Sequence, residues 1–443
     1  MNNWFSKHLV FPIMLRLYGE NALEILKELE KSQWLPHEKI ADLQLEKLKY
    51  IFCHSYEKIP YYRRVLREYG LNPYHIRSLG DIEKYPILKK EDVKENFADL
   101  IITPKAKRFE ERYTSGTTGL AFGFIKDRVA TSHMRAIDFR AYGWHGIDVG
   151  SKQGRFWSSE IKQEGVYRQR IKDFILNRRR YSVMNISDTE FHKYYEHMKK
   201  FRPTYVYGYA SAIFEFSNFM LREKLQSIKS VKTVITTSEM LFPNQRACIE
   251  DAFKCGCVNE YGCTEVGIVA FECPENNLHL MEDNLYIEFA KGGKRAQPRE
   301  NGDILVTELN NFSMPFLRYD LGDVGSYSTE RCRCGRGLAL MQSMDGRRNS
   351  FFRTTDGRIV YDNIFDFMVK SPHVKLFKVI LLSDTKILVR IVPQNDRIPE
   401  EIIEEFTKVI RRYVGDNMAI EYEMVGIIER ETSGKRNYFQ SLV

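Results

Sequence analysis

A chain of 443 residues is too long for one compact core, so we expect at least two domains. Hydrophobic residues make up 43% and charged residues 28% of the sequence, an ordinary balance for a soluble globular protein. The net charge of +8 is a mild excess over this length, which suits an anionic small ligand. The densest basic run, Arg178-Arg179-Arg180, is predicted to be a solvated surface, so we expect no nucleic-acid partner.

An apolar run at residues 9–15 follows Lys7 and His8 near the start of the chain. The run is too short to span a bilayer, is stopped by Arg16 and lacks a small-residue cleavage site. We expect a helix that packs on its own domain, with peripheral membrane association as the alternative. No later segment approaches transmembrane length. The eight cysteines are unevenly spaced, unlike a secreted disulfide framework, so we expect a cytoplasmic protein.

The first hundred residues are predicted to be mainly helical, because apolar residues recur at helical spacing in residues 21–30 and prolines punctuate the rest. Beyond Arg112, short apolar runs alternate with helical patterns, which argues for an α/β domain. Its clearest predicted strands are 231–237 and 304–307, and its clearest predicted helices are 188–200 and 210–224.

The end of the chain has a different texture. After about Asp345, strands are predicted at 379–382 and 387–392 and a helix at 399–413, an order that suggests a small α+β domain. We therefore predict an α/β chain with a large N-terminal domain of mixed sheets, 1–344, whose residues 1–105 form a helical entry region. The small C-terminal domain is predicted to span 345–443.

The strongest local motif is Tyr113-Thr114-Ser115-Gly116-Thr117-Thr118-Gly119-Leu120. Small hydroxyl residues bracketed by glycines can wrap backbone N–H groups and hydroxyls around phosphate oxygens, because nothing bulky blocks the approach. The Walker A spacing is absent and no lysine follows. A Ser/Thr-rich turn is the alternative interpretation of the loop taken alone.

Four further motifs follow in order. Asn259-Glu260-Tyr261-Gly262-Cys263-Thr264-Glu265 offers an aromatic face for a base and a carboxylate able to hold Mg²⁺. Residues 315–323 end in Asp323 after a glycine turn, suited to accept hydrogen bonds from ribose hydroxyls. Asp345-Gly346-Arg347-Arg348 lies at the predicted domain boundary, and Ser433-Gly434-Lys435-Arg436 places a lysine on a glycine turn.

The order of these motifs resembles the adenylate-forming superfamily of acyl-CoA synthetases, over about residues 113–435. Within it, Tyr207-Gly208-Tyr209-Ala210-Ser211 and Thr237-Ser238-Glu239-Met240-Leu241 are similar to the phenylacetate–CoA ligase branch, which includes coenzyme F390 synthetase and CapK-like proteins. The resemblance implies a large AMP-binding domain, a small mobile C-terminal domain, and an active site between them. It also implies a small carboxylic acid and ATP with Mg²⁺ as substrates, and CoA or another acyl acceptor.

The resemblance assigns roles position by position. Lys435 would bridge the acid and the α-phosphate, Glu265 would associate with Mg²⁺, and Thr117 of the phosphate loop would join them as catalytic. The predicted nucleotide-binding residues are Thr114, Ser115, Gly116, Thr117, Thr118, Gly119, Ser238, Glu239, Asn259, Tyr261, Gly262, Thr264, Asp323 and Arg347. The predicted substrate-pocket residues are Tyr207, Gly208, Tyr209 and Ala210.

Two departures from the family pattern stand out. Many relatives continue the phosphate loop with Pro-Lys-Gly, whereas Ala121-Phe122-Gly123 follows here, so no loop lysine contributes. The family usually has acidic residues after the Gly-Arg pair of the hinge, whereas Arg348-Asn349-Ser350 follows here. Since that hinge implies domain rotation between adenylation and thioester formation, the change bears on the CoA-dependent step.

A second constellation concerns metal. Cys273 and His279 are separated by five residues, and Cys332 and Cys334 form a C-x-C pair. Three thiolates and one imidazole would make a closed tetrahedral zinc site of structural character, and several phenylacetate-ligase-like proteins carry a similar set. Four free or buried side chains are the alternative.

Three hypotheses of function remain open. The first is an acyl- or aryl-CoA ligase, and aromatic residues near the predicted pocket, such as Trp157 and Tyr207, would suit an aryl or arylacetic acid. The second is an acid-activating enzyme with an amine or hydroxyl acceptor, for instance a sugar in surface-polysaccharide assembly. The third is a non-catalytic nucleotide-binding homologue, against which the joint presence of Glu265, Asp323 and Lys435 argues.

Overall fold

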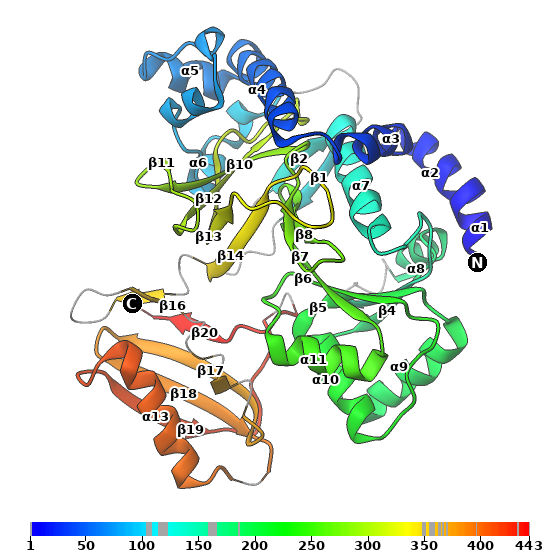
Figure 1. The fold of residues 1–443 in the computed structure, drawn as a ribbon, viewed down its shortest axis with the longest axis vertical. Coiled ribbons are helices and arrows are strands. Elements are labelled where there is room, and N and C mark those ends of the chain that lie inside the picture. Colours follow the sequence, from blue (N-terminus) through cyan, green and yellow to red (C-terminus); the bar gives the residue numbers. More distant parts are fainter. Residues whose placement is uncertain are drawn as a thin grey trace.

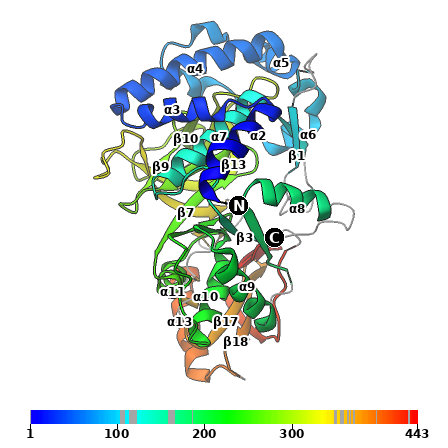
Figure 2. The same cartoon turned by 90° about the vertical axis from the view of Figure 1, so that its right-hand side faces the viewer.

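The structure is a computed structural model, which describes residues 2–102, 109–113, 123–157, 166–184, 187–347, 351–353, 359–361, 365, 367–368, 371–395, 397–431 and 434–442. Figures 1 and 2 show a large body of helices around one long twisted sheet, with a smaller C-terminal unit at one end. Within the described part, no helix combines the length and apolarity needed to cross a membrane.

The entry region is mainly helical, because its apolar residues follow a helical period and its prolines stand at the first turns of α2, α5 and η2. Its elements are α1 (Asn3–Phe5), the π-helix η1 (Ser6–Val10), α2 (Phe11–Tyr18), α3 (Ala22–Ser32), α4 (His37–Lys58), α5 (Pro60–Glu68), η2 (Pro73–His75), η3 (Leu79–Lys84), α6 (Lys90–Glu95) and η4 (Phe97–Leu100). The later helices are α7 (Arg128–Gly143), α8 (Val166–Ile175), α9 (Asp188–Phe201), α10 (Ala210–Arg222), α11 (Pro243–Phe253) and α13 (Glu400–Val414).

One sheet of 12 strands runs through the large body, in the order β11-β10-β12-β13-β14-β9-β8-β7-β6-β5-β3-β4. Its first half is parallel: β3 (Gln153–Trp157), β4 (Arg178–Ser182), β5 (Tyr205–Tyr209), β6 (Thr233–Thr237) and β7 (Gly256–Cys263). Its second half is antiparallel: β8 (Gly267–Glu272), β9 (Leu278–Leu280), β10 (Leu285–Lys291), β11 (Lys294–Arg295), β12 (Gly302–Glu308), β13 (Tyr319–Ser328) and β14 (Leu340–Arg347). The strand direction changes at β7, which therefore divides the sheet into a parallel part and an antiparallel part.

Helices cover both faces of the parallel half. Its strands are buried on both faces, which is why β5 and β6 consist almost wholly of buried residues. One face packs on α9, α10 and α11, and the other packs on α2, α3 and α7. A separate short ribbon of β1 (Phe109–Tyr113) and β2 (Gly123–Asp127) precedes α7.

The C-terminal unit has a four-stranded sheet in the order β19-β18-β17-β20, on which α13 packs. Its strands are β17 (Val374–Ser383), β18 (Lys386–Pro393), β19 (Ala419–Met424) and β20 (Phe439–Ser441). The short ribbon of β15 (Phe351–Arg353) and β16 (Ile359–Tyr361) lies between the two parts of the chain. We propose a domain division close to the predicted boundary after residue 344, near the point where β14 of the large sheet ends at Arg347.

Most predicted elements lie within two or three residues of the observed ones, while β17 begins five residues before the predicted strand. The prediction of a solvated surface for Arg178-Arg179-Arg180 holds for Arg179, which is exposed, and is wrong for its two neighbours in β4. The side chains of Arg178 and Arg180 are only 10% and 20% exposed and both contact the carboxylate of Asp173 on α8. One buried carboxylate thus pairs with two of the three arginines.

Candidate functional site

The predicted site segments gather at one edge of the sheet. The parallel strands β3, β5, β6 and β7 all point the same way, so their carboxyl ends meet at this edge, which is where open α/β sheets bind ligands. The predicted pocket residues 207–210 end β5, Ser238 and Glu239 follow β6, and residues 259–265 end β7 and turn into β8. Register between neighbouring strands, and not sequence proximity, brings the segments together.

Close backbone approach explains the glycines at this edge. A side chain at Gly208 would overlap the carbonyl oxygen of Phe156 on β3, and one at Gly262 would overlap that of Gly267 on β8. Ser238 has a left-handed backbone, with φ of 67°, a conformation that non-glycine residues adopt at a cost and often at functional sites. The backbones of neighbouring strands therefore lie too close together at this edge to admit a side chain at Gly208 or Gly262.

Tyr261 and Asp323, predicted to contact the base and the ribose, touch each other. The Tyr261 hydroxyl donates to the Asp323 carboxylate at 2.7 Å, which links β7 to β13. Asp323 in turn lies opposite Arg347 in the β13–β14 ladder. The backbone of Asn259 is held by Glu272 at the end of β8, because the Asn259 N–H donates to the Glu272 carboxylate at 2.7 Å.

Glu265, the predicted Mg²⁺ residue, lies in the turn after β7 and accepts a hydrogen bond from the hydroxyl of Tyr319 at 3.3 Å. Burial, with the charge of Glu265, raises the pKa of Tyr319, so the phenol stays protonated and remains a donor. The predicted Mg²⁺ residue Glu265 and the predicted ribose residue Asp323 each accept a hydrogen bond from a tyrosine hydroxyl.

The C-terminal segment reaches the same edge. The Glu239 carboxylate accepts the backbone N–H of Ser211 at 2.8 Å through one oxygen and that of Arg436 at 2.7 Å through the other. Lys435 precedes Arg436, and its carbonyl accepts the Glu431 N–H at 3.0 Å to close a turn. The predicted catalytic lysine is thereby held next to the Ser238–Glu239 turn.

Side chains reinforce this docking. Glu215 on α10 receives Arg430 at 2.8 Å and Arg436 at 3.1 Å, and Arg430 also donates to the Ser211 hydroxyl at 2.9 Å. The two arginine side chains are only 7% and 12% exposed, so the pairs are shielded from solvent. Ion pairs in such surroundings are screened less than surface pairs.

Part of the predicted site lies outside the described residues. This holds for the phosphate loop, residues 114–119 with Thr117 among them, for residues 348–350 of the hinge, and for the side chain of Arg347. Their assigned roles stay predictions.

A buried polar cluster on the α7 side of the edge was missed by the sequence reasoning. The Glu260 carboxylate accepts the hydroxyls of Tyr207 at 2.8 Å and Tyr142 at 3.1 Å. Burial raises the pKa of Glu260, although hydrogen bonds from Tyr207, Thr237 and Tyr142 oppose the shift. Strand alternation was the available signal, since Glu260 must face away from Tyr261.

Two charged groups adjoin this cluster. Asp138 lies one turn before Tyr142 on α7, and burial followed by the charge of Glu260 raises its pKa to about 7. The Arg155 guanidinium stacks 4.3 Å from the Trp157 ring centroid and 4.8 Å from that of Tyr207. Among the described residues, Arg155 has no ion-pair partner and its buried Nε has no acceptor. The end of β5, where the predicted pocket residues lie, is thus bordered by the polar residues Glu260, Asp138 and Arg155 and by the Trp157 ring.

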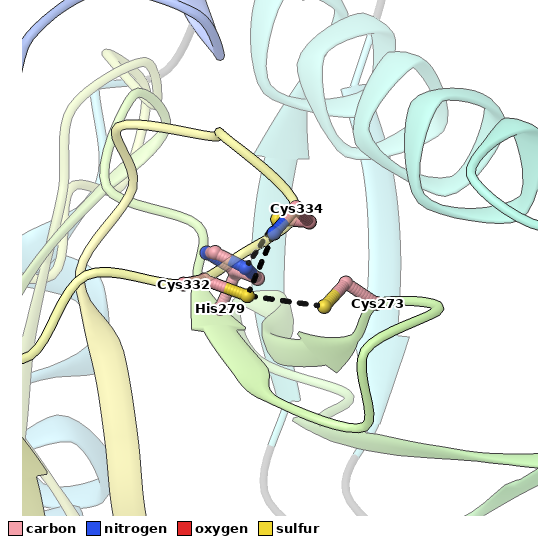
Figure 3. Close-up of side chains that lie close together, drawn as sticks. All are labelled: Cys273, His279, Cys332 and Cys334. Atoms are coloured by element: carbon pink, nitrogen blue, oxygen red, sulfur yellow. Dashed lines mark hydrogen bonds between the residues drawn. The ribbon is translucent and has the colours of Figure 1, made fainter.

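The four predicted metal ligands come together, as Figure 3 shows. The ligand atoms of Cys273, His279, Cys332 and Cys334 all lie within 4.8 Å of one another. The Cys273 and Cys332 sulfurs are 3.6 Å apart, and the Cys334 sulfur is 3.2 Å from His279 Nε2. Ligands of a tetrahedral zinc with its usual bond lengths would be about 3.5–3.8 Å apart.

The histidine is prepared for coordination. His279 Nδ1 lies 3.0 Å from the Leu338 carbonyl, so Nδ1–H donates there and Nε2 is free of its proton. Burial lowers the pKa of His279 to about 4, which keeps the imidazole neutral. The ligands tie the β8–β9 hairpin to the loop between β13 and β14, and all four positions are protein side chains. The donor set fits a structural zinc ion and leaves no open position for catalysis.

A cavity of about 600 Å³ lies elsewhere, between α4 and residues 309–312, and is lined by none of the predicted site residues.

No family model matches the sequence. Curated relatives do: the chain is 26% identical to a phenylacetate–coenzyme A ligase of Thermus thermophilus over 71% of each chain. It is 25% identical to that of Aromatoleum evansii over 92% of this chain and 96% of the relative. A crystal structure of 2-hydroxyisobutyryl-CoA ligase in the postadenylation state superposes with a TM-score of 0.76 at 19% identity, covering 93% of this chain and 91% of the other.

The fold is that of the adenylate-forming acyl-CoA ligases. By sequence, the chain is similar to phenylacetate–coenzyme A ligases, at 26% and 25% identity to the two relatives named above. The predicted fold class and the predicted resemblance are both confirmed. The same 2-hydroxyisobutyryl-CoA ligase in its thioesterification state superposes with a TM-score of 0.62.

Proposed function

We propose that the protein uses ATP to activate a small carboxylic acid as an acyl adenylate and then transfers the acyl group to CoA. The observation that carries the proposal is the docking of Arg436 on Glu239, which holds Lys435 at the sheet edge where the predicted nucleotide residues meet. The names of the relatives support the same two steps, since they are ligases of an acid with coenzyme A.

In the first step, a carboxylate oxygen of the acid attacks the α-phosphorus of ATP, and the bond to pyrophosphate breaks. Negative charge builds on the equatorial oxygens, which the Lys435 ammonium group would offset. Glu265 would hold the Mg²⁺ that accompanies ATP, with Tyr319 fixing its orientation. Asp323 would accept the ribose hydroxyls, with Tyr261 beside it for the base. In the second step the CoA sulfur attacks the acyl carbon and AMP leaves.

The acid would enter on the α7 side of the same edge. Tyr207 belongs to the predicted substrate segment, and its hydroxyl is committed to Glu260. Arg155, Asp138 and Glu260 give this wall a polar character, while Trp157 and the tyrosine rings give it flat apolar faces. We therefore expect an acid with an aromatic or similarly flat body that carries a polar substituent.

A second candidate function keeps the adenylation step and changes the acceptor to an amine or hydroxyl, for instance on a sugar in surface-polysaccharide biosynthesis. The unusual hinge sequence Arg348-Asn349-Ser350 favours it, because an acceptor other than CoA does not require the same domain rotation.

The metal cluster is proposed to hold one structural zinc ion. Four convergent ligands and a histidine oriented by a backbone carbonyl support this.

The first test is acid-dependent ATP–pyrophosphate exchange with a panel of aryl, fatty, hydroxy and amino acids. We expect exchange with one acid class, and a loss of about 10²–10³-fold or more in Lys435→Ala. Lys408→Ala, an exposed lysine on α13, is the matched control and should exchange normally. Adding CoA, amines or sugars then separates the two candidate acceptors. ATP binding without exchange for any acid would favour a non-catalytic homologue and contradict the proposal.

A further inference from the structure

The helical segment formed by α1, η1 and α2, residues 3–18, is apolar on both its inner and its outer face. Its inner face is an ordinary packing surface: Phe11, Met14 and Leu15 are buried against α3 and α7. Two polar contacts fix it to the body, from Lys7 to Asp148 at 2.8 Å and from Asn3 to Thr204 at 3.2 Å. The segment is therefore a fixed part of the fold.

Its outer face is exposed and largely apolar, although His8 and Arg16 are exposed as well. The exposed side chains are Trp4 at 64%, Phe5 at 46%, Leu9 at 42%, Ile13 at 57%, Leu17 at 81% and Tyr18 at 53%. These are six of the 21 exposed large hydrophobic side chains among the described residues, gathered within residues 4–18. A surface helix of a soluble protein normally turns polar residues outward, so a continuous outer apolar face indicates a docking surface.

The face continues onto a neighbouring helix. Asn177, just after α8, donates to Asn3 at 3.3 Å, and both views show α8 beside α1. Helix α8 adds Ile171 and Phe174, which are 46% and 64% exposed. The apolar area is thus broader than one helix.

Positive charges outnumber negative ones beside the face. Residues 2–19 contain Lys7, His8 and Arg16 and no acidic residue, and Lys7 pairs with Asp148 next to the segment. A shallow hollow of about 310 Å³ between this segment and α3 is edged by Lys7, Lys27 and Glu30. The face contains Trp4, Phe5 and Leu9, residue types that are common on the apolar face of helices lying in the plane of a membrane surface. An exposed apolar face with a net positive charge beside it matches an anionic lipid surface.

We propose that α1, η1 and α2 form a peripheral docking face for an anionic lipid bilayer, with the helices parallel to the surface and Leu9, Ile13 and Leu17 inserted. A second copy of this chain fits the face less well, because residues 2–19 contain no carboxylate to pair with Arg16 of the other copy, and the neighbouring Asp148 already pairs with Lys7. The inference concerns a surface far from Lys435 in the chain and does not depend on the proposed activity.

The test is co-sedimentation of the full chain with vesicles of phosphatidylcholine alone or mixed with phosphatidylglycerol. We expect binding to the anionic vesicles that weakens in high salt, and a loss of about tenfold or more for the double variant Ile13→Glu with Leu17→Glu. Both side chains are exposed, so the variant should fold, which its melting curve and its ATP–pyrophosphate exchange would verify. The matched control is Tyr69→Glu with Tyr413→Glu, whose side chains are 65% and 49% exposed and lie elsewhere.

Absence of binding by the natural chain, or equal binding by the double variant, would overturn the proposal. Sedimentation velocity without vesicles separates the alternative: a dimer that becomes a monomer in the double variant would assign the face to a second copy and would also overturn it.

Discussion

Glu215 offers a sharp test of whether the docked C-terminal segment serves adenylation. Its carboxylate receives Arg430 at 2.8 Å and Arg436 at 3.1 Å across the interface, and it is not among the predicted nucleotide residues. Glu215→Gln keeps the size of the side chain but removes its charge and one acceptor. Arg430 keeps its hydrogen bond to the Ser211 hydroxyl of α10 at 2.9 Å, and the Arg436 N–H keeps Glu239 at 2.7 Å, so the interface is weakened and not abolished.

The expected magnitude follows from the two shielded pairs. Hydrogen bonds to charged groups contribute about 1.5–3 kcal/mol each, and the remaining partners offset part of the loss, so we expect the docked arrangement to lose about 2–3 kcal/mol. Since 1.4 kcal/mol is tenfold, the docked population relative to the undocked one falls by up to about a hundredfold. ATP–pyrophosphate exchange should fall by a corresponding factor if docking is required for that step.

The assay compares two half-reactions. Exchange measures adenylation, and thioester formation from a synthetic acyl adenylate and CoA measures the second step. We expect Glu215→Gln to slow the first and to leave the second unchanged or faster, because only adenylation uses the docked Lys435. Glu223→Gln, at the end of the same helix in an exposed pair with Arg222, is the matched control. An equal fall in both half-reactions, or no fall in either, would refute the reasoning.

Three further predictions follow from single contacts. Cys332→Ser should lower zinc content by elemental analysis and lower Tm, whereas Cys53→Ser, outside the cluster, should change neither; protein without stoichiometric metal would contradict the zinc site. Because the pKa of Asp138 is raised to about 7 in the folded chain, its stability cost is absent near pH 4 and grows until pH 7, so Asp138→Asn should raise Tm relative to the natural chain at pH 8 and not at pH 4. A pH-independent difference in Tm would count against that cause. Tyr261→Phe removes one donor to Asp323 and should raise KM for ATP about fivefold with kcat little changed; an unaltered KM would show that the hydroxyl is unimportant for binding.

The sequence predicts the fold well where local patterns and motif order agree. Residues 188–200 and 210–224 are helical because their apolar residues face one side, and the helices α9 and α10 follow that period closely. Periodicity does not predict which strands pair. The order of the motifs indicated the fold, and the structure has β5, β6 and β7 as parallel neighbours. The four residues of the metal cluster were also predicted from the sequence, because cysteine and histidine at such spacings indicate a possible metal site.

Polar pairing between elements is difficult to predict from the sequence. Asp173 lies only five and seven residues before Arg178 and Arg180, but the spacing does not identify it as their partner, so the basic run was predicted to be a solvated surface. Likewise Glu260 stood inside a recognised motif, but its contacts with Tyr142 and Tyr207 come from elements 118 and 53 residues away. Such contacts depend on the register of neighbouring strands and on which helices pack against the sheet. Local sequence patterns do not specify either.

Two adjacent residues of the C-terminal segment, Lys435 and Arg436, have different contacts. Arg436 is committed to holding, because its N–H binds Glu239 and its guanidinium binds Glu215. Lys435, one residue earlier, is positioned by that anchorage, and the turn hydrogen bond from Glu431 to its carbonyl fixes the backbone on the other side. In the proposed mechanism, the Lys435 ammonium group would meet the α-phosphate only while the C-terminal segment is docked. If the Arg436 contacts were broken, Lys435 would move away with its turn, so this one interface would control when the charge is available for adenylation.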